Sequence, residues 1–247
     1  MKVLQQTMEV EITVRQRVDA LDWAAAEQSL SSHGYAVTAP LLKAEECAAL
    51  IALYKDEKRF RSHVVMERFR FGVGDYKYFE NPPPQVVASL RAAAYSHLAK
   101  VANVWAEAFG ESRAKYPPEH AAFLEECYKA GQKKPTPLML HYEAGGYNCL
   151  HQDLYGDVSF PLQMVLLLGQ AGHDWEGGEF ILVEQQPRAQ SKAEVVHANQ
   201  GQAILFTTRY RPVKGARSYY RVNLRHGVSR VHRGTRYTLG IIFHDAK

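Results

Sequence analysis

After Gly131 the chain consists of short apolar runs of strand length, and glycines separate these runs from one another. The runs are Leu138–Tyr142, Leu162–Leu168, Phe180–Val183, Ala203–Thr207 and Tyr237–Phe243. The turn signals between them are Gly145-Gly146, Gly169–Gly172, Gly177-Gly178 and Gly201. Repeated short strands with turns between them are typical of a β-sandwich or barrel. The second half of the chain is therefore predicted to be all-β.

Before Gly131 the pattern is mainly helical. Helical spacing predicts helices over Val18–His33, Lys43–Tyr54, Gln85–Phe109 and His120–Ala130. A short strand is expected at Tyr35–Val37, and strands joined by a flexible loop are expected at Arg59–Phe79. Since 247 residues suit one hydrophobic core, we predict a single α+β domain over residues 1–247. Its mainly helical part would span 1–131 and carry the strand-rich insert, and its β core would span 132–247.

Composition narrows the class of protein. Hydrophobic residues make up 46% and charged residues 23%, as in ordinary globular proteins. The sequence has no apolar run of about eighteen residues that could span a bilayer, and its N-terminus lacks the basic-then-apolar order of a signal peptide. Cys47, Cys127 and Cys149 are widely spaced and odd in number, so we expect reduced, buried thiols. These features predict a cytoplasmic protein that stays out of membranes.

Positive charge is concentrated near the C-terminus. From Val195 to His244 the sequence contains no Asp or Glu. The cations of this stretch are Arg209, Arg211, Lys214, Arg217, Arg221, Arg225, Arg230, Arg233 and Arg236. A one-sign block of this length indicates an anionic partner or ligand, and the alternative is an ordinary solvated basic face.

One constellation of residues carries chemistry. In an extended chain, residues i and i+2 share a face, so His151 and Asp153 can present an imidazole and a carboxylate side by side. A distant third histidine would complete a 2-His-1-carboxylate triad, which leaves open positions on Fe(II). A co-substrate with a distal carboxylate would also need a cation on the next strand. Of the five histidines downstream, His226 alone has a cation ten residues later, Arg236, with Thr238 on the same strand face.

These motifs resemble those of the 2-oxoglutarate/Fe(II) dioxygenase superfamily. The ten-residue gap between the last histidine and the arginine is similar to that of the prolyl-4-hydroxylase-like branch. Three further segments match the family core: Tyr142–Tyr147, Gly177–Phe180 and Gly201–Phe206. The resemblance covers roughly Leu138–His244. It implies a double-stranded β-helix, or jelly roll, with flanking N-terminal helices, and it implies that His151, Asp153 and His226 hold the iron and form the catalytic centre.

The same resemblance implies a site for the co-substrate. Arg236 would form a bidentate pair with the outer carboxylate of 2-oxoglutarate, and Thr238 and Tyr142 would supply hydroxyl groups to that carboxylate. Dioxygen would be the oxidant and ascorbate a reductant. Oxidation of a substrate C–H would release succinate and CO2.

Three hypotheses for the substrate remain open. The chain resembles a prokaryotic family of oxygenases assigned to the demethylation of damaged nucleic-acid bases, a role in DNA repair, and its basic block and tyrosines suit phosphates and stacked bases. Alkylated-DNA-repair dioxygenases carry a second arginine six residues after the first, but this chain has Ile242 there. That departure favours a prolyl or other protein-residue hydroxylase. The third alternative is a binding module without catalysis, and the oligomeric state is left open.

Overall fold

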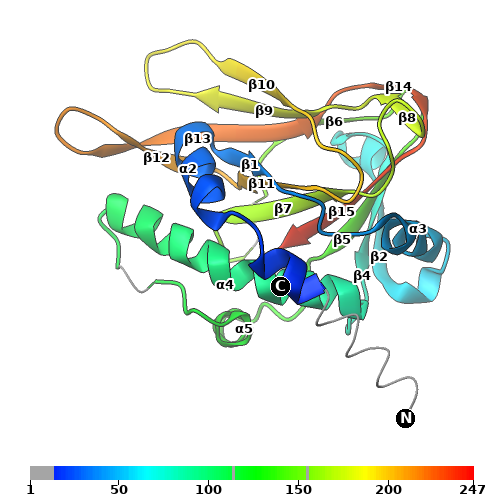
Figure 1. The fold of residues 1–247 in the computed structure, drawn as a ribbon, viewed down its shortest axis with the longest axis horizontal. Coiled ribbons are helices and arrows are strands. Elements are labelled where there is room, and N and C mark those ends of the chain that lie inside the picture. Colours follow the sequence, from blue (N-terminus) through cyan, green and yellow to red (C-terminus); the bar gives the residue numbers. More distant parts are fainter. Residues whose placement is uncertain (1–13, 113–114, 154–155) are drawn as a thin grey trace.

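The computed structural model describes residues 14–112, 115–153 and 156–247. Its core is a pair of antiparallel sheets that face each other, as Figure 1 shows. The larger sheet has the order β1 (Tyr35–Val37), β11 (Ala203–Thr207), β7 (Leu162–Leu167), β15 (Arg236–Ile242), β5 (Leu138–Tyr142), β4 (Asp75–Phe79), β2 (Phe60–Val65). All of its neighbouring strands are antiparallel. The predicted α+β class with an antiparallel double-stranded β-helix core is confirmed.

The smaller sheet covers one face of the larger one. Its order is β10 (Lys192–Val196), β9 (Phe180–Gln185), β13 (Tyr219–Val228), β6 (Tyr147–His151), β3 (Gly72–Val73), with β12 (Tyr210–Lys214) paired to β13 as well. A separate two-stranded ribbon joins β8 (Trp175–Gly177) and β14 (Val231–Gly234). The long strand β13 therefore lies at the centre of this layer.

Strand β7 is buried on both of its faces, which explains its apolar sequence. Met164 and Leu166 belong to the cluster of buried side chains shared with the helices, whereas Val165 and Leu167 belong to the cluster between the two sheets. A strand that is buried on both faces needs a continuous apolar run. Figure 1 shows helix α4 (Gln85–Ala108) along the face of the larger sheet that is turned away from the smaller one.

The predicted helices are confirmed with one correction. Helices α3 (Ala44–Leu53), α4 and α5 (His120–Lys129) begin and end within one residue of the predicted bounds. The single helix expected over Val18–His33 is wrong, because residues 14–19 are helical and α2 starts anew at Trp23–His33. Asp22 caps α2 by accepting a hydrogen bond from the Ala25 backbone N–H, and such a cap begins a helix. No described helix combines the length and the apolar character needed to cross a membrane.

The segment Arg59–Phe79 connects both sheets. After the short 3-10 helix η1 (Glu57–Arg59), β2 and β4 extend the larger sheet beyond β5, while β3 adds to the edge of the smaller sheet beside β6. Between β2 and β3 the chain forms the 3-10 helix η2 (Met66–Phe69). The insert is therefore part of the β core, and β3, which follows η2, pairs with the strand that ends at His151.

Candidate active site

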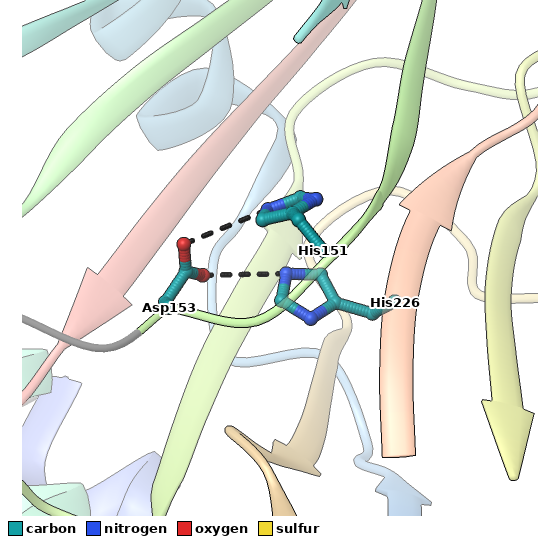
Figure 2. A group of neighbouring side chains, drawn as sticks. All are labelled: His151, Asp153 and His226. Carbon is teal, nitrogen blue, oxygen red and sulfur yellow. Dashed lines mark ion pairs between the residues drawn. The ribbon is translucent and has the colours of Figure 1, made fainter. Parts of the chain in front are cut away.

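Three side chains meet where the smaller sheet faces the larger one. His151 is the last residue of β6 and lies opposite His226 of β13, with Asp153 two residues further on. Figure 2 shows the carboxylate of Asp153 facing both imidazole rings. Its Oδ1 lies 3.5 Å from Nε2 of His151, and its Oδ2 lies 3.3 Å from Nε2 of His226. The pairing of two strands thus brings together residues that are 75 positions apart.

The donor set suits a divalent metal ion. One ligand atom from each residue lies within 4.8 Å of the other two. Nδ1 of His151 lies 2.7 Å from the carbonyl oxygen of Cys149, to which it can only donate, so Nε2 carries the lone pair. Two imidazoles and a carboxylate that leave the remaining positions open match the preference of non-haem Fe(II).

The charge state of these groups also suits a cation. Burial alone would raise the pKa of Asp153, but its hydrogen bond and charge interaction with His226, helped by His151, hold that pKa well below its usual range. Burial lowers the pKa of His226. An ionised carboxylate and a neutral imidazole are the forms in which these residues bind metals.

Gln163 supports the carboxylate. Its Nε2 donates to Oδ2 of Asp153 at 2.9 Å, and the side chain is only 3% exposed. Sequence reasoning missed this residue. A signal was present, because Gln163 is the polar residue within the otherwise apolar run Leu162–Leu168.

Arg236 begins β15 and lies in the same pocket. It is 2% exposed, and its Nε has no hydrogen-bond partner among the described residues. Burial lowers its pKa to about 10. Its guanidinium lies between two rings, with its carbon 5.6 Å from the centre of Tyr142 and 5.9 Å from that of Trp175. A buried guanidinium with an unsatisfied donor is a strong site for a carboxylate.

The two predicted hydroxyl residues lie beside this cation. Thr238 is 1% exposed on β15, two residues after Arg236 and on the same strand face. Tyr142 on β5 is fully buried opposite Arg236, and its hydroxyl accepts a hydrogen bond from Nδ2 of Asn148 at 3.3 Å. Burial raises the pKa of Tyr142 to about 12, so its hydroxyl is a donor as well.

A pocket of about 390 Å³ contains all six predicted site residues. They are His151, Asp153, His226, Arg236, Thr238 and Tyr142. Aromatic rings also line the pocket, among them those of Phe71, Tyr76 and Tyr78. The volume exceeds what a five-carbon dicarboxylate needs, so space remains for part of a second molecule.

Some expectations about the site need correction. Arg236 is not on the strand that follows β13, because β14 intervenes and pairs with β8. Cys149 was expected to be a buried thiol, as Cys47 and Cys127 are, but it is exposed and lines the pocket. Cys149 is the middle residue of β6, and its side chain is open to solvent.

The basic block does not form one uniform surface. Arg211 is buried in an ion pair with Glu184, with its Nη2 2.6 Å from the carboxylate. Arg233 pairs with Glu176 in the ribbon, and Arg221 lies 3.4 Å from Glu111. The basic block itself contains no acid, but acidic residues from other parts of the chain pair with several of its arginines.

The comparisons with known proteins agree with this geometry. Residues 74–246 match the model of the family described as "Oxygenase, catalysing oxidative methylation of damaged DNA". Uncharacterized proteins from two strains of Mycobacterium tuberculosis are 44% identical over 168 residues, which are 68% of this chain and 72% of theirs.

Solved structures share the fold at low identity. A prolyl-4-hydroxylase from Pseudomonas putida has a TM-score of 0.53 at 17% identity, over 91% of this chain and all (100%) of that one. A 2OG-Fe(II) family oxidoreductase from Burkholderia pseudomallei has a TM-score of 0.53 at 16% identity, over 91% and 92%. The chain therefore belongs to this oxygenase family, a family of oxidoreductases, and it shares its fold with solved structures of 2OG-Fe(II) oxygenases.

Proposed function

We propose that the protein binds Fe(II) through His151, Asp153 and His226 and uses 2-oxoglutarate to oxidise a C–H bond of a methylated nucleic-acid base. The observation that carries the proposal is Arg236, a buried cation with an unsatisfied Nε in the pocket of the His/Asp triad. A cation is stable in such a place when an anionic ligand completes its hydrogen bonds. Bound Fe(II) would supply the redox chemistry that couples decarboxylation of the keto acid to reduction of dioxygen.

The residues of the chain would orient the co-substrate. Arg236 would hold the outer carboxylate in a bidentate pair, and Thr238 and Tyr142 would donate hydroxyl hydrogens to the same group. The keto acid end would then point along the pocket towards the triad. The overall balance consumes one 2-oxoglutarate and one dioxygen, and it yields succinate, CO2 and a hydroxylated substrate.

The choice of a methylated base as substrate rests on the family description and on the pocket. Aromatic side chains line this pocket, and rings of this kind stack on bases. A hydroxylated N-methyl group leaves as formaldehyde, which gives a second product to measure. The alternative is hydroxylation of a prolyl or other protein residue, which the ten-residue spacing from His226 to Arg236 favours.

The test is succinate formation by the purified protein with Fe(II), 2-oxoglutarate and ascorbate. A panel of methylated oligonucleotides and proline-containing peptides should show stimulation by a methylated oligonucleotide, together with release of formaldehyde. Stimulation by a peptide alone would replace the nucleic-acid substrate with a protein one. Absence of succinate under all conditions, with no metal bound at the triad, would refute the oxygenase chemistry as well.

A further inference from the structure

Two aromatic side chains stand exposed beside the pocket. Phe69 is 56% and Phe71 is 46% exposed, and their rings stack on each other with centroids 5.5 Å apart and planes 21° from parallel. Arg68 and Arg70 are exposed in the same four-residue stretch, Arg68–Phe71, hereafter the Phe69 turn. Neighbouring phenyl rings in water are unfavourable, so such a patch usually marks a surface for a partner.

The Phe69 turn is held firmly against the site. Phe71 accepts a hydrogen bond at its carbonyl from the N–H of Cys149, at 2.8 Å, and donates its own N–H to Met66 at 3.1 Å. Met66 is fully buried beneath the turn. Gly72 follows at φ 143°, where an added Cβ would lie 2.2 Å from the Tyr147 carbonyl oxygen. The turn is thereby fixed to β6, which ends at His151, and its rings are presented in a set position.

The position of the turn connects it to the chemistry. Arg70 and Phe71 line the pocket that contains the triad, and the exposed Arg68 and Phe69 directly precede them in the chain. Among the described residues that line this pocket, Asp153 is the one acid, and it faces the two histidines. The lining of the pocket therefore offers a bound molecule arginine and aromatic side chains, and its one carboxylate faces the histidines.

Cations interleaved with exposed rings match one class of polymer. Arginines contact phosphates, and phenyl faces stack on bases of any sequence. In a duplex the faces of the bases are covered by their neighbours, so stacking on Phe69 requires an unpaired strand. A peptide offers neither a regular row of anions nor a row of planar groups.

We propose that the Phe69 turn binds single-stranded nucleic acid. This inference rests on the proposed function, since it places the base to be oxidised in the pocket. Bases that flank the oxidised one stack on Phe69 and Phe71, and Arg68 and Arg70 contact the phosphates between them. The enzyme then acts on unpaired or locally opened strands in preference to intact duplex.

The test measures binding of the full chain to a fluorescent twelve-residue oligothymidylate by anisotropy. Phe69→Leu keeps an apolar side chain but removes the ring, and it is expected to weaken binding by about tenfold. Phe69→Trp keeps a stacking surface and should bind at least as tightly as the parent. Arg68→Gln should reduce the slope of log affinity against log salt by about 0.7, the share of one phosphate contact on a single strand.

Two matched control residues lie on helices α4 and α5, outside the Phe69 turn. Tyr128 on α5 is an aromatic residue with 61% exposure, and Lys100 on α4 is an exposed cation. Tyr128→Leu and Lys100→Gln should leave both affinity and salt slope unchanged. Because Phe69 and Arg68 are exposed, their variants are expected to fold like the parent, which circular dichroism checks.

The possible outcomes test the binding role of the Phe69 turn and the oxygenase activity separately. Unchanged affinity in Phe69→Leu, binding of a duplex as tight as that of the single strand, or displacement of the oligothymidylate by a proline-containing peptide of equal length would overturn the assignment of the turn. Succinate formed from 2-oxoglutarate without any oligonucleotide tests the oxygenase chemistry separately. If affinity does not depend on the Phe69 ring but succinate is still formed, the proposed surface is refuted and the proposed function is retained. If affinity depends on the ring but no succinate is formed, the proposed function is refuted.

Discussion

Arg236 and Tyr142 lie opposite each other on β15 and β5, and both are almost completely buried. The carbon of the guanidinium is 5.6 Å from the centre of the phenol ring. The ring stabilises the cation through its π face, but it offers Nε no hydrogen bond. The pair is therefore arranged around an anion that both residues can contact.

Replacement of the buried Arg236 should affect thermal stability and the binding of 2-oxoglutarate in opposite directions. Arg236→Met removes a desolvated charge and is expected to raise the melting temperature of the metal-free protein, by about 2–4 °C for each kcal/mol gained. The same variant should lose the stabilisation that 2-oxoglutarate gives, and its KM for 2-oxoglutarate should rise by about tenfold to a hundredfold. Thermal scans with and without 2-oxoglutarate measure both effects. The exposed Arg233→Met is the control, and an unchanged response to 2-oxoglutarate in Arg236→Met would contradict the assignment.

The metal ligands can be tested without turnover. Asp153→Asn and His226→Ala should weaken binding of Co(II) or Mn(II), measured by calorimetry, by more than the roughly 10–100-fold that loss of a supporting residue costs. His173 is the matched control, because its side chain is 80% exposed and lies next to Asp174 in a loop. His173→Ala should bind metal like the parent. Equal loss in all three variants would mean that the triad is not the metal site.

Gln163 is expected to tune the metal site through Asp153. Gln163→Met keeps the size of the side chain but removes the amide that donates to Oδ2. Metal affinity should fall by about tenfold or more, and Gln163→Glu should cost more because two carboxylates would repel each other. Gln28 lies exposed on α2, so Gln28→Met serves as the control. Full affinity in Gln163→Met would show that the hydrogen bond has no part in orienting the carboxylate.

Acid should destabilise the fold through buried histidines outside the site. Burial lowers the pKa of His120 to about 3, helped by Arg91, and that of His244 to about 4. In the unfolded chain both would take up a proton near pH 6.5. Between pH 6.5 and the folded pKa values the unfolded state binds more protons, so stability falls as the pH falls.

The magnitude can be checked by urea unfolding. Each of these two histidines is expected to lower the free energy of unfolding by about 2 kcal/mol when the pH is changed from neutral to 5. His120→Gln keeps a donor for the carbonyl of Phe243 and should reduce the loss between pH 7 and pH 5 by about this amount. The exposed His173→Gln should not change it. A pH dependence that is the same in His120→Gln and the parent would contradict the prediction.

The parts of the fold that sequence predicted were those with a strong local signal. Strand β7 is a continuous apolar run, and α4 has 24 residues of good helix formers, so each was evident on its own. Strand β13 was missed, although Val222, Leu224 and His226 alternate with exposed or half-buried residues. A half-buried strand should alternate apolar and polar residues with a period of two, but the arginines and tyrosines of β13 make this alternation hard to recognise in the sequence.

The residues of the site that could be predicted are those whose spacing along the sequence is characteristic. The positions of His151, Asp153, His226 and Arg236 along the chain indicated a shared site, and the structure brings them into one pocket. The contact between Gln163 and Asp153 depends on how β7 meets the end of β6, which no local pattern encodes. The pairing of basic-block arginines with distant acids, such as Arg211 with Glu184, depends on the sheet order in the same way.

The two edge strands of the larger sheet come from the first 65 residues, the three-residue β1 at one side and β2 at the other. The region that matches the oxygenase family begins at residue 74, so it contains the His/Asp triad and Arg236 but neither of these strands. A protein shortened to that region would leave the backbone groups of β11 and β4 without partners along two rims. Such open rims promote pairing between molecules. We therefore expect a chain shortened to this region to associate with itself more readily than the full chain does.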